Sequence, residues 1–481
     1  MTTIAALNKK GNDVVSRVIQ TLASLKQEES HFIIASPTVF CEAENAQTLS
    51  HKHLNSTTVI GCVQPNRLEK LMPVFAQTAN ATSVFEGRFY PSARMGFKSQ
   101  LNQEPSVTHE IVLGNLLREV EGDFSVILAE PERILVARDP VGVQPLYYAE
   151  NAELAALASN RTALWRLGLT DVCSFPSGNL ASITKKEFEF KPVRTLAFQK
   201  TRQTTLEESA QKLLRLLEHS VRIRVHDVNE VAVAFSGGLD SSVVAFLAKK
   251  CGAQVNLIHV SLRGQPETED AKTAADELEL PLSVHLFEAD DIERTVSKVV
   301  ELIEEPNPIK AAIGIPFYWV AQKTAAAGFD VLLAGQGADE LFGGYRRYYN
   351  EYFSHGAVAV RKTMFNDVVR LPESNLERDE KICGFHGVQL RLPFASFGIA
   401  EFALTLPVKL KIERKQDGLR KLVLRRLARN IGLPEAAVNK PKKAVQYATG
   451  VNAFLGKIAR KRGLTVGEYI QKVFREHEVN R

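Results

Sequence analysis

Two acidic residues in glycine-rich segments are the strongest candidates for chemistry in this sequence. Asp240 lies in Ser-Gly-Gly-Leu-Asp-Ser-Ser at 236–242, and Asp339 lies in Gly-Gln-Gly-Ala-Asp-Glu at 335–340. Glycine lets a backbone approach phosphate closely, and the free N–H groups at a helix start bind anions. A carboxylate repels polyphosphate unless a divalent cation lies between them. We therefore expect Asp240 and Asp339 to share Mg²⁺ on the phosphates of a bound ligand.

The first glycine-rich segment carries the other groups that a phosphate site needs. Its two glycines leave room for a phosphate, and its serine hydroxyls can donate hydrogen bonds. The alternative without a ligand is a cap that only starts a helix. A Walker-type site is excluded, because the sequence contains no Gly-x-x-x-x-Gly-Lys-Ser/Thr. The expected phosphate-binding residues of this loop are Ser236, Gly237, Gly238, Leu239, Asp240, Ser241 and Ser242.

Alternating strand and helix patterns surround both loops. Expected strands lie at 231–235, 255–260, 282–287 and 331–334, and expected helices lie at 241–250, 270–278 and 317–327. This alternation predicts an α/β fold with a doubly wound parallel sheet, in which ligands bind beyond the carboxyl ends of the strands. From about 346 onward the pattern is mainly helical, with a basic amphipathic helix at 418–430.

The N-terminal part has a different pattern of short apolar runs broken by turn residues. Expected strands lie at 32–35, 57–60, 83–85, 124–128 and 134–137, and expected helices lie at 14–25 and 110–120. A polar, basic stretch at 191–205 precedes a strongly periodic helix at 206–225. We therefore expect an α+β domain at 1–195 and a second domain at 206–481.

Composition narrows the class of protein without identifying it. The 481 residues carry a formal net charge of +5, which fits anionic small ligands as easily as nucleic acid, so charge alone does not decide between them. Nucleic acid is not an expected partner, because the basic stretches are read as solvated helix faces. The five cysteines lie far apart, which argues against a disulfide scaffold or a structural zinc site. Neither a signal peptide nor a membrane-spanning run is recognisable, so a cytoplasmic protein without membrane partners is expected. A homodimer is left open.

The second half resembles a known family through four ordered motifs. The segment at 236–242 resembles the PP-loop of ATP pyrophosphatases, which cleave ATP to AMP and pyrophosphate. Together with residues 332–348, 386–394 and 433–444, it is similar to the asparagine synthetase family. The resemblance implies a HUP-like synthetase domain with a helical C-terminal part, which uses ATP and Mg²⁺ to adenylate a carboxylate.

The same resemblance implies roles for further residues. Lys442 matches the lysine that neutralises charge on the adenylate and pyrophosphate, with Lys443 as the neighbour that could be mistaken for it. The adenine and ribose would be lined by Ala234, Val260, Ala334 and Gly335. Gln336 is assigned to the catalytic set, although it stands where the family often carries a carboxylate, and an amide cannot act as a base. Ser396 replaces the aspartate that usually follows the Pro-Phe motif.

The first half is similar to the class II glutamine amidotransferase domain, which implies an Ntn-hydrolase-like αββα sandwich. The match rests on residues 121–126 and 137–148. Three positions depart from the family: Thr2 replaces the nucleophilic cysteine, Glu86-Gly87 replaces the Asn-Gly oxyanion element, and Thr108 replaces a substrate-binding aspartate. We therefore expect a domain without glutaminase activity and a nitrogen supplied as ammonia, although Thr2 could act as a nucleophile if the initiator methionine were removed.

The resulting prediction is an asparagine synthetase-like ligase with the small-molecule substrates ATP, aspartate or another carboxylate, and ammonia. Three alternatives stay open. One is a β-lactam-synthetase-like ligase, which also lacks the N-terminal cysteine, although Gln336 stands where those enzymes carry a tyrosine. The others are a PP-loop enzyme that modifies tRNA, suggested by basic stretches at 420–429 and 457–462, and a nucleotide-binding regulator without catalysis.

Overall fold

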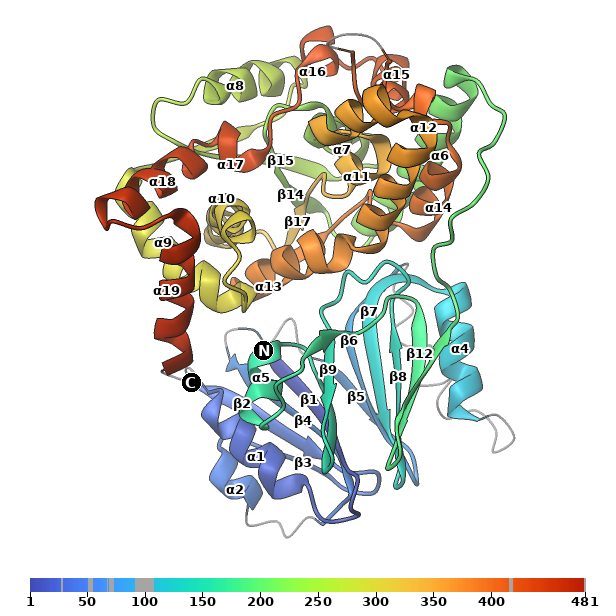
Figure 1. Ribbon diagram of the computed structural model, residues 1–481, viewed down its shortest axis with the longest axis vertical. Coiled ribbons are helices and arrows are strands. Elements are labelled where there is room, and N and C mark those ends of the chain that lie inside the picture. The colour runs from blue at the N-terminus through green and yellow to red at the C-terminus, as the bar shows by residue number, and fades with distance from the viewer. Residues whose placement is uncertain are drawn as a thin grey trace. The chain divides into compact units, whose positions relative to one another are not determined.

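The computed structural model describes residues 1–26, 29–50, 55–66, 68, 73–90, 108–414 and 418–479 (Figure 1). The chain forms two compact units, Met1–Thr195 and a second that begins at Leu196. The two units have different sheet types, since the strands of the first pair antiparallel and those of the second pair parallel.

The N-terminal unit contains two antiparallel sheets. The first has the spatial order β11 (Cys173–Ser174), β9 (Tyr147–Glu150), β10 (Leu154–Ala158), β1 (Thr2–Asn8), β4 (Thr58–Pro65), β2 (Ser30–Ala35) and β3 (Phe40–Ala43). The second has the order β13 (Phe188–Pro192), β12 (Asn179–Thr184), β8 (Arg133–Arg138), β7 (Glu121–Ala129), β6 (Thr82–Tyr90) and β5 (Val74–Gln77).

Alternation along β1 explains how the two sheets form a layered core. Ile4 and Ala6 pack in a cluster with α1 (Val15–Ser24), whereas Ala5 and Leu7 pack in the cluster that contains both sheets. On the other side, α4 (His109–Glu119) buries its leucines against the phenylalanines of β6 and β7. The smaller helices of this unit are α2 (Ala46–Ser50) and α5 (Arg161–Arg166). The expected αββα sandwich is confirmed.

The second unit is built on a five-stranded parallel sheet. Its spatial order is β16 (Leu282–Phe287), β15 (Gln254–Leu262), β14 (Glu230–Ala234), β17 (Val331–Leu333) and β18 (Gln389–Arg391). The surrounding helices include α6 (Leu206–Val225), α7 (Leu239–Lys250), α8 (Glu267–Glu277), α9 (Ala289–Ile303) and α10 (Pro308–Ala326) (Figure 1). Helices cover both faces of the sheet, which accounts for the mostly buried residues of β14, β15 and β17, whereas β16 at the edge is partly exposed. The doubly wound α/β prediction is confirmed.

Among the elements of the second unit that differ from the expectations, three have an identifiable cause. The strand β18 lies inside the motif at 386–394, which periodicity had not marked as a strand. The helix α10 begins at Pro308 rather than at 317, because Asn307 caps it by accepting from the backbone N–H groups of Ile309 and Lys310. The helix α15 (Leu422–Asn430) begins later than 418, because Lys421 has a left-handed backbone with φ of 59°.

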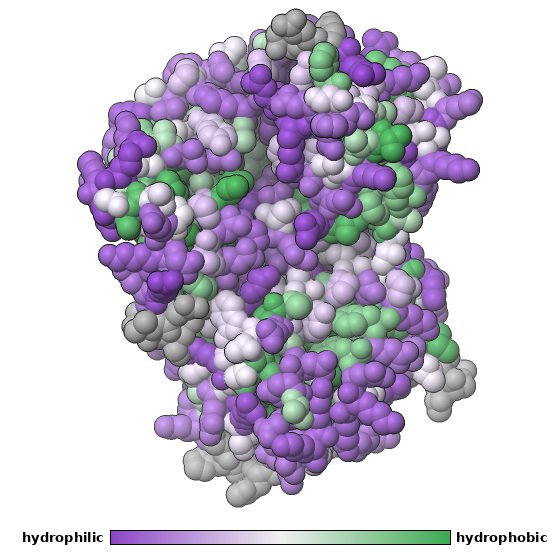
Figure 2. Space-filling view, in the orientation of Figure 1, coloured by the Kyte–Doolittle hydropathy of each residue, from purple (hydrophilic) through white to green (hydrophobic). Residues whose placement is uncertain are grey.

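The remainder of the second unit is mainly helical, as expected. Its helices are α11 (Ala338–Phe342), α12 (Arg346–Val369), α13 (Glu377–Phe385), α14 (Phe397–Thr405), α16 (Glu435–Asn439), α17 (Val445–Ala448), α18 (Val451–Lys461) and α19 (Val466–Val479). On the face that Figure 2 shows, hydrophilic residues predominate and hydrophobic ones are scattered. Among the helices in the described ranges, none is both long enough and apolar enough to cross a membrane.

Candidate active site

The first glycine-rich loop joins the end of β14 to the start of α7. Gly237 has φ of 63°, and a Cβ there would lie 2.8 Å from Ala271 Cα, so this position favours glycine both by conformation and by space. The loop is braced by its own hydroxyls, since Ser236 Oγ lies 3.3 Å from Ser241 Oγ and accepts from the Gly238 N–H. The loop therefore has a defined shape at the N-terminus of a helix of 12 residues.

The second loop lies beside the first because β14 and β17 are neighbouring parallel strands. A Cβ at Gly335 would lie 2.9 Å from Asp240 Cβ, and a Cβ at Gly344 would lie 1.8 Å from Asp339 Oδ1. Glycine at both positions therefore allows the backbone to approach the two carboxylates closely. Two loops that are about a hundred residues apart in sequence thus place their aspartates in one place.

Two lysines join the aspartates. Lys421 Nζ lies 2.8 and 2.6 Å from the two carboxylate oxygens of Asp240 and 2.5 Å from Asp339 Oδ1. Lys442 Nζ lies 2.7 Å from Asp339 Oδ2 and 3.9 Å from Asp240 Oδ2. Two ammonium groups and two carboxylates therefore form one compact cluster. The Lys421 side chain is only 3% exposed.

Within this cluster, the lysines and the aspartates favour the ionised forms of one another. Burial alone would raise the pKa of the Asp339 carboxyl, but Lys421 and Lys442 outweigh burial and hold the pKa well below its usual range. Burial likewise opposes the charge of Lys442, and the two aspartates outweigh it, so the pKa of Lys442 is raised. Both groups are therefore ionised at neutral pH.

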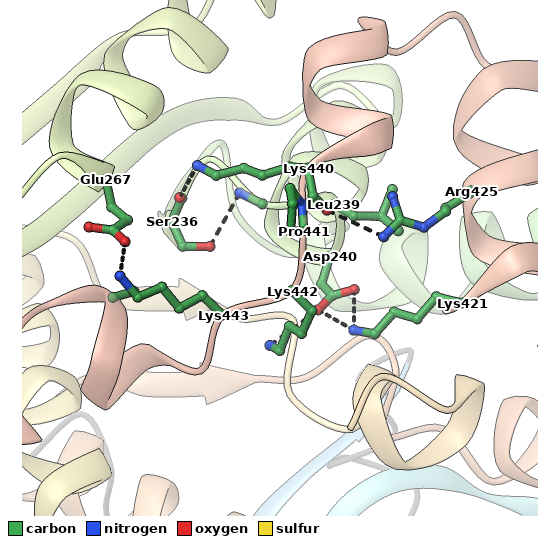
Figure 3. Close-up of a pocket in the computed structure, with 12 residues that line it drawn as sticks. Ser236, Leu239, Asp240, Glu267, Lys421, Arg425, Lys440, Pro441, Lys442 and Lys443 are labelled. Atoms are coloured by element: carbon green, nitrogen blue, oxygen red, sulfur yellow. Dashed lines mark hydrogen bonds and ion pairs between the residues drawn. The ribbon is translucent and has the colours of Figure 1, made fainter. Parts of the chain in front are cut away.

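Contacts on either side of Lys442 distinguish it from its neighbours. Lys443 pairs with Glu267, and Lys440 Nζ lies 3.2 Å from Asp270 Oδ2 and donates to the Ser236 carbonyl at 3.4 Å. Figure 3 shows Lys440 pointing toward Ser236 and Lys443 toward Glu267. The geometry therefore favours Lys442, rather than Lys443, as the lysine that pairs with the two aspartates.

A pocket lies over this cluster. It is lined by Ser236, Gly238, Leu239, Asp240, Glu267, Lys421, Arg425, Lys440, Pro441, Lys442, Lys443 and Ala448. Five of the expected site residues line it, and Asp339 reaches it through Lys421 and Lys442. Other expected residues do not line it, namely Ala234, Gly237, Ser241, Ser242, Val260, Ala334, Gly335 and Gln336. Gln336 instead donates from Nε2 to Asp379 Oδ2 at 2.5 Å.

Lys421 and Arg425 were missed in the sequence. They lie at the start of the helix that the sequence marked only as basic and amphipathic. Arg425 donates from Nε to the Arg420 carbonyl at 2.7 Å and from Nη1 to the Val438 carbonyl, so it ties α15 to the segment that carries Lys442. The one local signal was a lysine just ahead of an apolar face, which does not reveal a partner 181 residues away.

The donor set suits Mg²⁺ that is bound together with phosphate. Within the described ranges, no group of three or more His, Cys, Asp or Glu side chains could hold a metal by itself. Mg²⁺ commonly takes one or two carboxylates, keeps some waters and completes its octahedron with substrate phosphates. Asp240 and Asp339 fit that pattern, although Lys421 and Lys442 contact the same oxygens.

In the N-terminal unit, two residues at positions that depart from the family, Thr2 and Glu86, are hydrogen-bonded to neighbouring side chains. Glu86 is 3% exposed, accepts from Thr3 Oγ1 and lies 3.5 Å from Gln144 Nε2. Asn160 Nδ2 donates to Thr2 Oγ1 at 2.6 Å. Cys62 faces Thr3 in the neighbouring strand, and burial together with Glu86 raises the pKa of its thiol to about 12, so it holds little thiolate at neutral pH.

Replacing Glu86 with glutamine is expected to make the protein relatively more stable as pH rises. Burial raises the pKa of the Glu86 carboxyl above its ordinary value, against hydrogen bonds from Thr3 and Gln144. The folded state then binds more protons than the unfolded state, so stability falls as pH rises above about 4.5. Glutamine keeps the shape and cannot ionise. Thermal unfolding of both proteins should be measured at about pH 5 and at about pH 8. The melting temperature of Glu86→Gln relative to the unaltered protein should be higher at about pH 8 than at about pH 5, and a difference that does not change with pH would contradict this.

Comparison with known proteins agrees with these motifs. The asparagine synthase family model matches residues 212–359 and 351–477, and the glutamine amidotransferase domain model matches residues 77–166. A Methanocaldococcus jannaschii protein assigned as a glutamine-hydrolyzing asparagine synthetase is 30% identical over 410 residues, which cover 75% of each chain.

Two eukaryotic relatives are more distant. Proteins assigned as glutamine-hydrolyzing asparagine synthetases are 24% identical over 346 residues in Dictyostelium discoideum and 28% identical over 318 residues in Schizosaccharomyces pombe. These matches cover 68% and 60% of this chain but 62% and 55% of the relatives, so the chain spans less than two thirds of their length. The family models and the archaeal relative decide the classification: the chain belongs to the asparagine synthetase family of carbon–nitrogen ligases.

Proposed function

We propose that this chain converts aspartate to asparagine by way of an aspartyl adenylate, with ATP cleaved to AMP and pyrophosphate. The observation that carries this proposal is the convergence of Asp240 and Asp339, from two strand-end loops, on Lys421 and Lys442. Such a cluster concentrates charge at the N-terminus of α7, where a triphosphate can bind.

In the first step, a side-chain carboxylate oxygen of aspartate attacks the α-phosphorus of ATP. A new P–O bond forms as the bond between the α-phosphorus and the bridging oxygen breaks, and that oxygen leaves with pyrophosphate. Lys442 and Lys421 neutralise the charge that builds up on the α- and β-phosphates, from positions set before the reaction begins. Mg²⁺ held by Asp240 and Asp339 would add positive charge at the leaving group.

In the second step, an ammonia nitrogen attacks the acyl carbon, AMP leaves with the acyl-bound oxygen, and the nitrogen loses a proton to form the amide. We propose free ammonia as the nitrogen source. The support is Glu86, a buried carboxyl hydrogen-bonded to Thr3 at the position of the family's oxyanion element. Both oxygens of Glu86 accept hydrogen bonds, from Thr3 and Gln144, so this side chain does not offer the donor that the negative charge of a tetrahedral intermediate needs.

The decisive experiment is exchange of labelled pyrophosphate into ATP, with and without aspartate and in the absence of any nitrogen donor. Aspartate-dependent exchange is expected, because formation of the adenylate is reversible. Exchange that depends on another carboxylate would instead assign a related amide-forming ligase. ATP binding without exchange on any amino-acid carboxylate would favour a regulator and would overturn the proposal.

Glutamine is expected not to replace ammonia. Asparagine formation should need added ammonium at about pH 8, and Thr2→Ala should change neither this rate nor any background release of glutamate from glutamine. Thr2 is already hydrogen-bonded to Asn160, and Glu86 is bonded to the adjacent Thr3. Liquid chromatography of asparagine and glutamate measures both. Glutaminase turnover that disappears in the Thr2→Ala variant would contradict the expectation.

A further inference from the structure

A buried carboxylate lies directly behind Gln336. The Asp379 side chain is fully buried, and Gln336 Nε2 donates to its Oδ2 at 2.5 Å. The neighbouring Arg378, whose side chain is 1% exposed, donates to the same carboxylate from Nε at 2.7 Å and from Nη2 at 3.0 Å. The sequence had indicated only that Gln336 lacks the carboxylate its family often carries.

These contacts determine which way the amide of Gln336 points. An ionised carboxylate only accepts hydrogen bonds, so the amide must present its NH₂ group to Asp379. Its carbonyl oxygen, Oε1, then faces away from Asp379. Within the part of the chain that the structure describes, Gln336 makes its side-chain hydrogen bond through Nε2, and no group donates to Oε1. The arrangement therefore offers a hydrogen-bond acceptor with a fixed direction.

Gln336 does not line the pocket over the aspartates, but its position in the second loop relates this acceptor to that pocket. Gln336 follows Gly335, which packs against Asp240, and precedes Asp339 in the same loop. The Gln336 side chain is partly exposed, whereas Asp379 is not. A negative charge one hydrogen bond behind the amide also polarises it and strengthens Oε1 as an acceptor.

We propose that Asp379 is a positioning residue, which holds Gln336 so that Oε1 accepts a hydrogen bond from a substrate nitrogen. This inference rests on the proposed function. The ligand chemistry is an N–H donor, either the α-ammonium group of the amino acid or the attacking ammonia. Gln336 does not take a proton; it selects and orients the nitrogen, and Asp379 acts only through Gln336.

The test compares Gln336→Met, Asp379→Asn and the double variant in two assays. Pyrophosphate exchange without ammonia gives the KM for aspartate, and asparagine formation gives the KM for ammonia. Gln336→Met is expected to raise one of these KM values about tenfold, as the loss of a hydrogen bond to a charged or polar nitrogen does. A higher KM for aspartate identifies the α-ammonium group, and a higher KM for ammonia alone identifies the nucleophile.

Non-additivity distinguishes positioning from a merely structural role. Asp379→Asn should raise the same KM about threefold to tenfold in the unaltered protein and leave it unchanged in the Gln336→Met background. An equal effect in both backgrounds would overturn the proposal. So would unchanged KM values in Gln336→Met alone, a variant that leaves the buried Arg378–Asp379 pair intact and is informative even if Asp379→Asn does not fold.

A matched control is Glu304→Gln. Glu304 is also a buried acid paired with a residue of α13, since Lys381 Nζ lies 2.6 Å from its Oε2. This variant should lower stability without moving either KM. Failure of the proposed function is separately recognisable: absence of aspartate-dependent exchange in the unaltered protein overturns both ideas, whereas normal exchange with unaltered KM values in Gln336→Met overturns only the positioning role.

Discussion

Replacing Lys442 with methionine is expected to slow aspartate-dependent pyrophosphate exchange by about 10²- to 10³-fold, the loss typical of removing one preorganised group that stabilises transition-state charge. Lys442 lies 2.7 Å from Asp339 in the pocket, and the aspartates raise its pKa, so it keeps its charge at neutral pH. Methionine has a similar length and lacks both the charge and the N–H donors of the ammonium group. The rate should be measured with saturating ATP and aspartate, so that binding losses do not dominate.

The matched control is Lys443→Met, in the adjacent position. Lys443 pairs with Glu267 and is half exposed, so its removal is expected to change exchange by no more than about threefold. The pair of variants tests the geometry directly. A larger loss in Lys443→Met than in Lys442→Met would show that the lysines had been assigned in the wrong order.

Replacing Lys421 with methionine is expected to damage both stability and catalysis. Lys421 is the buried cation that contacts both Asp240 and Asp339, so its loss leaves two close carboxylates with Lys442 as their remaining lysine. Breaking a buried ion pair by removing one partner costs about 3–5 kcal/mol. The exchange rate should fall by at least about 10²-fold, because both loops depend on this contact.

The stability loss in Lys421→Met should depend on pH in a defined direction. The two lysines lower the pKa of the Asp339 carboxyl, so its ionised form contributes stability above the ordinary aspartate pKa of about 4, and this contribution is lost as pH falls. The Lys421→Met variant loses part of this contribution, because one of the two lysines that lower the pKa of Asp339 is gone. Urea denaturation should therefore show the greatest difference from the unaltered protein near neutral pH and a smaller difference on acidification.

Two further variants serve as controls for Lys421→Met. Lys272→Met removes an exposed lysine that pairs with Glu269 and should alter stability by less than about 1 kcal/mol. Lys421→Arg keeps the charge and should retain more stability than the methionine variant. If Lys421→Met resembles Lys272→Met in both stability and exchange, the two carboxylates do not depend on this cation.

The architecture could be predicted because its causes are local. Strand and helix periodicity identified α6 at Leu206–Val225 and β16 at Leu282–Phe287 with the bounds that the structure has. Errors arose where another cause decides an element: the Asn307 cap starts α10 early, and the left-handed Lys421 delays α15. The strand β18 has three residues, which are too few to show an alternating pattern. It forms because its backbone pairs with the neighbouring strand β17.

Contiguous residues were enough to predict that two glycine-rich loops with Asp240 and Asp339 follow strands of a parallel sheet, because strand ends and glycine-rich turns are local features. Which side chains meet at these loops depends on tertiary packing. It pairs Lys421 with both aspartates, separates Lys442 from Lys443, and sets Asp379 behind Gln336. These pairings join residues from 43 to 181 positions apart, so they depend on how distant elements pack, and no local pattern records them.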